Sequence, residues 1–169
     1  KQFDVAVIGG GPAGLAAALK AHECGAERVL IIEREHRLGG ILNQCIHNRF
    51  GLTRFKESLT GPEYAYRFEE KVLSQSISVM VSTTVISLSK DKKLTLVNDK
   101  DGVFTVDAKS VILAMGCRER SRGALNIAGS RPAGIFSAGT AQKFVNIKGY
   151  MPGKRVVILG SGDIGLIMA

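Results

Sequence analysis

A glycine-rich turn between a short apolar run and a helical segment constrains the fold of this chain more than any other feature. Residues 3–9 (FDVAVIG) form an unbroken apolar run of the kind found in buried parallel strands. Residues 12–24 open with proline, continue with alanine and leucine, and are followed by Gly25, a pattern typical of a helix. Residues 28–33 (RVLIIE) predict a second strand. The order predicts a βαβ unit with a right-handed crossover.

The turn itself has the spacing GxGxxG. Gly9 permits a tight turn, Gly11 lets the backbone approach a pyrophosphate, and Gly14 allows the helix to pack closely on the strand. Pro12 and Ala13 begin the helix, whose N-terminal N–H groups and dipole attract phosphate. The turn therefore predicts a phosphate-binding site.

Glu33 ends the second predicted strand. A carboxylate at this place accepts hydrogen bonds from the hydroxyl groups of a ribose and repels a 2′-phosphate. The alternative interpretation is a glycine turn without a ligand and Glu33 as a solvated strand end. The order of strand, turn, helix and carboxylate favours a dinucleotide site.

The rest of the chain predicts a loop, further strands and two helices. The loop covers residues 34–61 and contains Gly39 and Gly40. Short β-prone runs separated by turn residues predict an antiparallel meander; these are residues 79–81, 85–88, 93–97 and 103–106. The other predicted elements are a helix at 62–76, a strand at 110–115, a linker at 116–134, a helix at 137–147 and a strand at 155–159.

The glycine fingerprint occurs a second time near the end of the sequence. Gly160, Gly162 and Gly165 follow an apolar run and repeat the GxGxxG spacing. Only residues 164–169 are left to build the helix, too few to cover a sheet. We expect the chain to be a fragment that ends as a second dinucleotide-binding unit begins.

Several motifs together resemble the two-dinucleotide-domain flavoproteins, the pyridine nucleotide-disulfide oxidoreductase superfamily. They are DVAVIGGGPAGLAAA, IIERE, the Gly39–Gly40 pair and SVILAMG at 110–116. The resemblance covers essentially the whole chain. It implies an α/β fold, a doubly wound parallel sheet with an antiparallel meander insertion. It also implies FAD in the first unit and NAD(P)H in the second. Residues 1–150 would form the N-terminal part of the FAD-binding domain and its linker, and 151–169 the truncated start of the NAD(P)-binding domain.

The resemblance also implies which residues contact the cofactors. The first strand of the meander, around Val85, would pass the adenine, and Met115 stands where the family usually has threonine. The residues implied to contact FAD are Gly9, Gly11, Pro12, Ala13, Gly14, Glu33, Arg34, Gly39, Gly40, Val85, Ala114, Met115 and Gly116. Those implied to contact NAD(P) are Gly160, Gly162 and Gly165.

Three further segments are similar to a narrower group of flavoproteins. GGILNQCIH, AMGCRERSRGAL and RPAGIFSAGTAQ resemble oxidoreductases related to the alpha subunits of amine-type oxidases and to flavoproteins that accompany glycerol-3-phosphate dehydrogenase. Such proteins work with a small-molecule or protein redox partner and with partner subunits. In the superfamily a later segment with an aspartate completes the FAD domain. Residues 134–140 resemble that segment but carry Thr140 in its place, so we expect an incomplete flavin site and an inactive fragment.

The cysteine pattern argues against disulfide chemistry. Disulfide reductases of the superfamily carry two cysteines in the loop after the glycine pair, whereas this loop has Cys45 alone. Without a second thiol, a mixed disulfide cannot be resolved. Cys45 and His47 are weak candidates for catalytic residues beside the flavin, and the alternative is a packing role. The wide spacing of Cys24, Cys45 and Cys117 indicates a reducing, cytoplasmic setting and no metal site.

Basic residues outnumber acidic ones, 23 against 15, giving a net charge of +8. No aromatic nucleic-acid motif accompanies them, so we expect no nucleic-acid partner. No apolar run is long enough to span a membrane. Arg118, Arg120 and Arg122 follow a predicted strand end; they either grip an anion or form a solvated linker with Glu119 as counter-charge.

We therefore expect part of an FAD-dependent oxidoreductase that moves hydride or electrons between NAD(P)H and a substrate or partner protein. One alternative is a subunit of a flavoenzyme that oxidises amines or hydroxy acids. Another is a nucleotide-binding module without catalytic activity.

Overall fold

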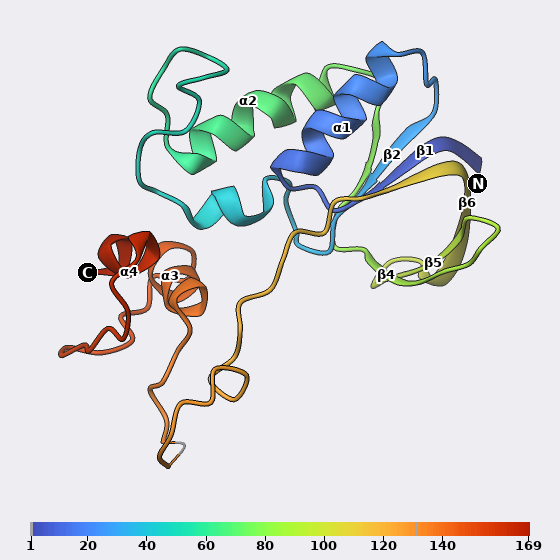
Figure 1. Ribbon diagram of the computed structural model, residues 1–169. Coiled ribbons are helices and arrows are strands. Elements are labelled where there is room, and N and C mark those ends of the chain that lie inside the picture. The colour runs from blue at the N-terminus through green and yellow to red at the C-terminus, as the bar shows by residue number, and fades with distance from the viewer. Residues whose placement is uncertain (1, 131) are drawn as a thin grey trace.

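A six-stranded sheet carries two helices on one face, and a long linker joins it to a separate helical segment at the C-terminal end (Figure 1). The computed structural model describes residues 2–130 and 132–169. The elements are β1 (Gln2–Ile8), α1 (Pro12–Glu23), β2 (Val29–Ile32), the 3-10 helix η1 (Gly40–Gln44), α2 (Gly61–Leu73), β3 (Ser78–Met80), β4 (Thr84–Leu88), β5 (Lys93–Asn98), β6 (Gly102–Leu113), α3 (Ala138–Asn146) and α4 (Asp163–Met168).

The sheet has the order β3-β2-β1-β6-β5-β4. Its first four strands are parallel to one another, and β5 and β4 complete it as an antiparallel meander. The predicted βαβ unit is confirmed as β1, α1 and β2, and so is the α/β fold class. Residues of β1 lie between two parallel partners, with Val7 opposite Ile31 and Ile112.

Strand β3 was expected in the meander, and that prediction is wrong. It pairs parallel with β2, with Val79 opposite Ile31, and so belongs to the nucleotide-binding side of the sheet. Its apolar run shows that a strand forms but not which strand it pairs with. The partner follows from α2, which returns the chain across the sheet as the second crossover.

Strand β6 is one strand of 12 residues, whereas the sequence predicted two separate strands at 103–106 and 110–115. Its first half pairs antiparallel with β5 and its second half parallel with β1. Asp107 and Lys109 interrupt the apolar pattern but not the backbone pairing. Each instead reaches an ion pair at the surface, with Lys93 at 3.8 Å and Asp4 at 2.8 Å respectively.

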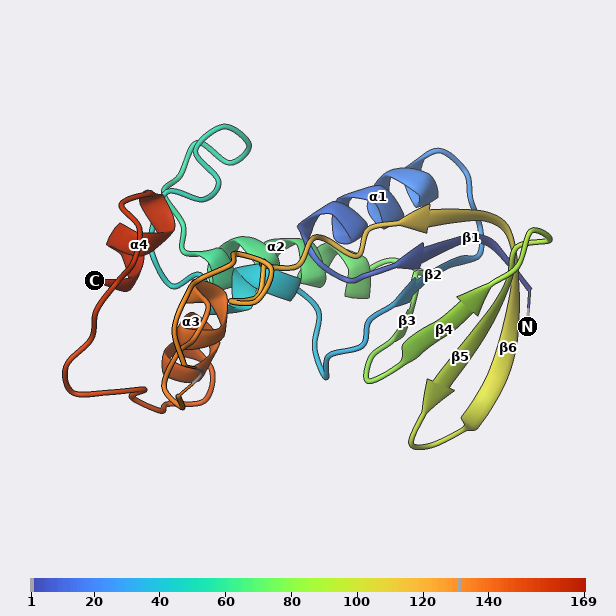
Figure 2. The same ribbon diagram turned by 60° about the horizontal axis from the view of Figure 1, so that its bottom comes forward.

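Alternate residues of β1 and β2 face two different cores. Val7 and Ile31 pack beneath α1 and α2, together with Leu15 and Phe68. The other face is covered by the curled meander, as Figure 2 shows. The residues buried there include Ala6, Ile8, Leu30, Ile32, Leu94, Leu96 and Val106. Because both faces are covered, every residue of β2 is apolar and buried.

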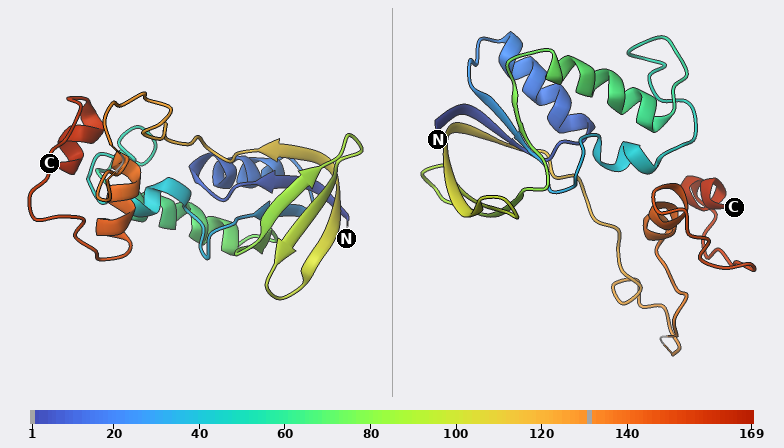
Figure 3. Two further views of the ribbon diagram at one scale, coloured as in Figure 1. Left: turned by 90° about the horizontal axis from the view of Figure 1, so that it is seen from below. Right: turned by 180° about the vertical axis from the view of Figure 1, so that it is seen from behind.

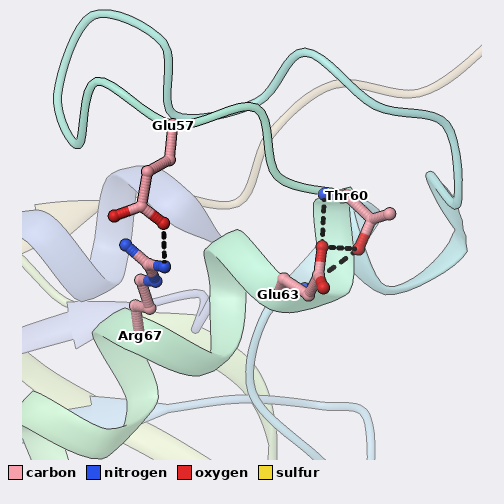
Figure 4. A network of polar contacts seen from close by, with 4 residues as sticks. All are labelled: Glu57, Thr60, Glu63 and Arg67. Atoms are coloured by element: carbon pink, nitrogen blue, oxygen red, sulfur yellow. Dashed lines mark hydrogen bonds and ion pairs between the residues drawn. The ribbon is translucent and has the colours of Figure 1, made fainter.

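Helix α2 begins with a capping box between Thr60 and Glu63 (Figure 4). The Glu63 carboxylate accepts from the Thr60 N–H at 2.7 Å, and the Glu63 N–H donates to Thr60 Oγ1 at 3.4 Å. The bond from the Thr60 backbone lowers the pKa of Glu63. Together these bonds satisfy donors that a helix start leaves unpaired, which fixes where the preceding loop ends.

The C-terminal segment lies apart from the sheet, beyond a linker without regular structure (Figure 3). The predicted helix at 137–147 is confirmed as α3. The predicted strand at 155–159 is wrong: Val157 and Leu159 are 96% and 83% exposed, and no strand among the described residues pairs with them. An apolar run needs a partner strand to become a buried strand. Among the described residues, no helix is both long and apolar enough to cross a bilayer.

Candidate functional site

The candidate site lies at the edge of the sheet where β1, β2 and β6 end. These strands are parallel neighbours, and Ile8 at the end of β1 is opposite Ile32 at the end of β2. The residues that follow the three strands are Gly9, Glu33 and Ala114. They therefore meet at the carboxyl edge, where open α/β sheets bind ligands.

Gly9 and Gly14 hold the glycine turn against the sheet. Gly9 has a φ of +105°, and a β-carbon there would run into the carbonyl group of Ala114. A β-carbon on Gly14 would run into the carbonyl oxygen of Gly9. The Gly9 N–H donates to Ile32 O at 2.8 Å, which ties the turn to β2 as well. Packing alone requires glycine at both positions.

The start of α1 has backbone N–H groups without an acceptor in the part of the chain that the structure describes. Gly11 is the N-cap and Pro12 lies in the first turn. The N–H groups of Gly11, Ala13 and Gly14 have no acceptor among the described residues. A β-carbon on Gly11 would approach no nearer than 3.9 Å to the Cα of Gly40. N–H groups of this kind at the start of a helix fit the oxygen atoms of a pyrophosphate.

Glu33 is buried, with 6% of its surface exposed, so the interpretation as a solvated strand end is wrong. Its Oε2 accepts from the Gly10 N–H at 2.7 Å, and its Oε1 from the Glu35 N–H at 2.8 Å. Each oxygen keeps a further lone pair for a ribose hydroxyl. The ribose contact stays a prediction, and the structure adds that Glu33 supports the glycine turn.

Gly10 is a residue of the site that the sequence analysis missed. A β-carbon on Gly10 would run into the side chains of Leu38 and Glu33. The Gly10 carbonyl accepts from the Gly39 N–H at 2.8 Å, so this residue joins the turn to the following loop. The signal in the sequence was the unbroken run of three glycines, of which the fingerprint uses only two.

The loop after β2 lies directly against the glycine turn. Gly40 has a φ of +55°, and a β-carbon there would lie 2.9 Å from the Cα of Gly11. The structure therefore brings Gly39 and Gly40 to the predicted phosphate site. Arg34 lies next to Glu33 with its side chain exposed. Its contact with FAD stays a prediction.

Val85 lies two residues after Thr83, which is hydrogen-bonded to the end of β2 at the site. The Thr83 N–H donates to the Glu33 carbonyl at 2.9 Å, which brings the start of β4 beside the end of β2. Thr83 is fully buried, and its Oγ1 accepts from Asn98 Nδ2 at 3.3 Å. Neither Thr83 nor Asn98 was predicted from the sequence as a residue of the site. Val85 itself is half-buried against the core beneath the meander.

The other side of the turn is formed by the residues after β6. The Ala114 N–H donates to Ile8 O at 2.8 Å, extending the pairing with β1. Met115 is 64% exposed, and a β-carbon on Gly116 would meet nothing within 4 Å. The predicted strand-end motif is therefore placed at the carboxyl edge, with room beside it.

Cys45 and His47 lie beyond η1, on the same loop as the glycine pair. Burial raises the pKa of the half-buried Cys45 thiol, which disfavours the thiolate. The His47 ring lies 5.1 Å from the ring of Phe50, and its Nδ1 is buried without a partner among the described residues. Neither observation points to a reactive nucleophile.

Helix α3 docks on the loop after β2 through polar contacts that the sequence did not reveal. Gln44 Nε2 donates to Gln142 Oε1 at 2.9 Å, and Asn146 Nδ2 donates to Gln44 O at 2.7 Å. Lys143 Nζ lies 3.0 Å from Glu35 Oε1, and this contact lowers the pKa of Glu35. These contacts hold α3 next to the candidate site.

Glu119 caps α3. Its Oε1 accepts from the Gly139 N–H at 2.5 Å and its Oε2 from Ser137 Oγ at 2.7 Å. Arg122 donates to the carbonyl groups of residues 128–130. Glu119 is therefore not the counter-charge of the neighbouring arginines, since no ion pair joins them in the described part of the chain.

The second fingerprint repeats part of the first one's packing. Gly162 is the N-cap of α4, and the Leu166 N–H donates to Gly162 O at 3.2 Å. A β-carbon on Gly165 would lie 2.9 Å from Gly160 O. In the first fingerprint a β-carbon on Gly14 would likewise run into Gly9 O. The turn thus starts a helix, although the strand expected before it is absent from the described residues.

Comparison with known proteins agrees with this geometry. A family model described as pyridine nucleotide-disulphide oxidoreductase matches residues 3–169. An opine oxidase subunit from Agrobacterium tumefaciens (strain Ach5) is 30% identical over 99% of this chain and 34% of its own length. Thioredoxin reductase of Ureaplasma parvum serovar 3 is 38% identical over 75% of this chain and 38% of its own.

The solved structure of L-proline dehydrogenase from P. horikoshii has a TM-score of 0.76 and 25% identity, covering 99% of this chain and 33% of that one. The chain thus spans about a third of the length of these relatives. Relatives in the family, among them thioredoxin reductase and ferredoxin–NADP reductase, use FAD and NAD(P)H. By its sequence and its fold, the chain belongs to the pyridine nucleotide-disulphide oxidoreductase family.

Proposed function

We propose that this chain is the N-terminal part of an FAD-dependent oxidoreductase that moves hydride between NAD(P)H and a substrate or a partner protein. The observation that carries the proposal is the start of α1, where three N–H groups have no acceptor among the described residues and lie near the buried carboxylate of Glu33. When bound, FAD supplies the redox chemistry, and the protein positions it and tunes its surroundings.

Each residue of the site has a role in this proposal. The N–H groups of Gly11, Ala13 and Gly14 bind the pyrophosphate, and Glu33 accepts from the adenosine ribose. The start of β4 near Val85 borders the adenine. We propose that further residues around the turn and at the end of β6 also contact FAD: Gly9, Pro12, Arg34, Gly39, Gly40, Ala114, Met115 and Gly116.

Residues 1–150 contribute the first part of the FAD-binding domain and its linker, and residues 151–169 begin the NAD(P)-binding domain. The similar contacts of Gly165 with Gly160 and of Gly14 with Gly9 support this division. The second turn, with Gly162 at its centre, would bind the pyrophosphate of the nicotinamide nucleotide.

A second function is that of one subunit of a larger flavoenzyme that oxidises an amine or a hydroxy acid. The matches to the opine oxidase subunit of Agrobacterium tumefaciens and to L-proline dehydrogenase favour it, because each covers 99% of this chain. In that case electrons enter from the organic substrate rather than from NAD(P)H.

Anaerobic reduction of the full-length protein separates the two functions. We expect the purified protein to show visible flavin absorbance, which NADH or NADPH bleaches faster than L-proline does. Faster bleaching by L-proline would favour the amine-oxidising function. A protein that carries no flavin and takes up none would contradict both.

A further inference from the structure

A hollow outside the nucleotide site is formed by the loop between η1 and α2. The loop projects past the amino-terminal end of α2 (Figures 1 and 2). The hollow has a volume of about 380 Å³, within the general size range of small-molecule sites. It is lined by Arg49, Phe50, Gly51, Leu52, Thr53, Arg54 and Tyr64.

The loop is held in one shape by its own bonds. Phe50 and Leu59 exchange two backbone hydrogen bonds of 3.0 and 2.8 Å, which close its base. The Phe55 N–H donates to Gly51 O at 2.7 Å across its tip. An ion pair of 2.5 Å between Arg67 and Glu57 ties the loop to α2 (Figure 4). The hollow therefore exists before a ligand arrives, which lowers the entropy lost on binding.

Two guanidinium groups at the hollow have no carboxylate partner. Arg49 and Arg54 are exposed, and no acidic side chain of the described residues lies within ion-pair distance of either. Arg67 differs, because Glu57 already pairs with it. The Arg54 guanidinium rests over the ring of Phe68 at 5.2 Å, which directs the group while leaving its N–H donors available.

The wall beside these charges is aromatic. The rings of Phe50 and Tyr64 lie 6.5 Å apart, and Phe50 also contacts the ring of His47 at 5.1 Å. Guanidinium groups beside aromatic rings suit a ligand that carries an anionic group on a hydrocarbon skeleton.

We propose that this hollow binds a small organic carboxylate. Arg49 and Arg54 pair with the carboxylate, and Phe50 and Tyr64 contact the hydrocarbon part of the ligand. This binding can be tested apart from the proposed function.

Calorimetric titration of the full-length holoprotein with benzoate tests the proposal. We expect R49Q and R54Q each to weaken benzoate binding by about tenfold, since each removes a charge-assisted hydrogen bond. R28Q is the matched control. Arg28 is an exposed arginine that directly precedes β2 and does not line the hollow, so its substitution should leave benzoate binding unchanged. Equal benzoate affinity in wild type, R49Q and R54Q would overturn the proposal.

Two further ligands identify what the arginines recognise. Benzamide has the same ring without the charge, and we expect it to bind at least about tenfold more weakly than benzoate. Equal binding of the two would overturn the carboxylate assignment. Hexaglutamate stands for an acidic partner protein, and tighter binding of this peptide than of benzoate would overturn the small-molecule assignment. A holoprotein with flavin absorbance but without benzoate binding contradicts this inference alone, and a protein without flavin contradicts the proposed function.

Discussion

Glu33 accepts a hydrogen bond from the Gly10 N–H at 2.7 Å, which joins a buried carboxylate at the end of β2 to the middle of the glycine turn. The same carboxylate accepts from the Glu35 N–H at 2.8 Å. The turn is therefore held by Glu33 without a ligand. If the N–H groups at the start of α1 bind a phosphate as proposed, they are already oriented for it, and little reorganisation is left to oppose binding.

Substituting Glu33 with glutamine tests this support. Glutamine offers one acceptor oxygen to two N–H donors, so one buried donor loses its partner. We expect Glu33→Gln to lower the free energy of unfolding by about 1–3 kcal/mol and to weaken FAD binding as well. Chemical denaturation and flavin titration of the full-length protein measure both. Glu70→Gln, at an exposed position on α2, is the control. Unchanged stability in Glu33→Gln would show that the two bonds contribute nothing.

Gly14→Ala tests the packing of α1 on the turn. The added methyl group would run into the carbonyl oxygen of Gly9, so either α1 or the turn must move. We expect a loss of about 1–3 kcal/mol in the free energy of unfolding, the usual cost of an overpacked contact. Thermal denaturation of the apoprotein gives the answer, and wild-type stability in this variant would contradict the close contact.

The ion pair between Glu35 and Lys143 makes the docking of α3 depend on pH. Lys143 holds the pKa of Glu35 below its ordinary value of 4.5. Since the folded pKa is the lower one, the contribution of the pair is present above pH 4.5 and is lost as pH falls through the folded pKa. We expect hydrogen exchange in α3, corrected for intrinsic exchange rates, to rise in this acid range.

The variant Lys143→Gln should abolish the acid-induced rise in hydrogen exchange in α3. Without the ammonium group, protonation of Glu35 no longer breaks an ion pair. Lys109→Gln is the control. It breaks the ion pair with Asp4 at the other end of the sheet and should keep the acid-induced rise in hydrogen exchange in α3. The same acid-induced rise in Lys143→Gln as in wild type would contradict a role for this pair.

Cys45 should be the slowest of the three cysteines to react with iodoacetamide. Burial raises the pKa of its thiol, whereas Cys24 and Cys117 are exposed. Thiolate fraction and access both control alkylation, so we expect Cys45 to react at least about tenfold more slowly. Mass spectrometry of timed samples reports each site. If Cys45 were alkylated first, it would be an activated thiol and a candidate catalytic residue after all.

The local part of the fold could be predicted from the sequence because its signals are local. The apolar run of β1, the glycine turn and the helix start at Pro12 each follow from residues next to one another. Strand β3 was placed in the wrong part of the sheet because its pairing with β2 depends on a crossover that its own residues do not encode. The continuity of β6 was missed because Asp107 and Lys109 look like a break.

In the candidate site, too, local features could be predicted from the sequence and contacts between distant residues could not. Its glycines were found by spacing, but the bond from Gly10 to Glu33 and the position of Thr83 depend on strands that meet only in the folded sheet. The contact between Gln44 and Gln142 joins residues 98 positions apart. Both glutamines lie in segments that resemble the narrower flavoprotein group, GGILNQCIH and RPAGIFSAGTAQ, but the resemblance does not say that the two segments touch.

The proposed FAD contacts all depend on the start of α1 holding the pyrophosphate of FAD. The amount of FAD that the full-length protein retains after gel filtration, compared with that of its Gly11→Val variant, tests this. A β-carbon at Gly11 would lie 3.9 Å from the Cα of Gly40 and clash with nothing, so we expect the variant to fold while its side chain occupies the space proposed for the phosphates. Gly153→Val, at a distant position, is the control. We predict one FAD per chain in wild type and control and none in Gly11→Val, whereas full retention of FAD by Gly11→Val would show that the pyrophosphate binds elsewhere.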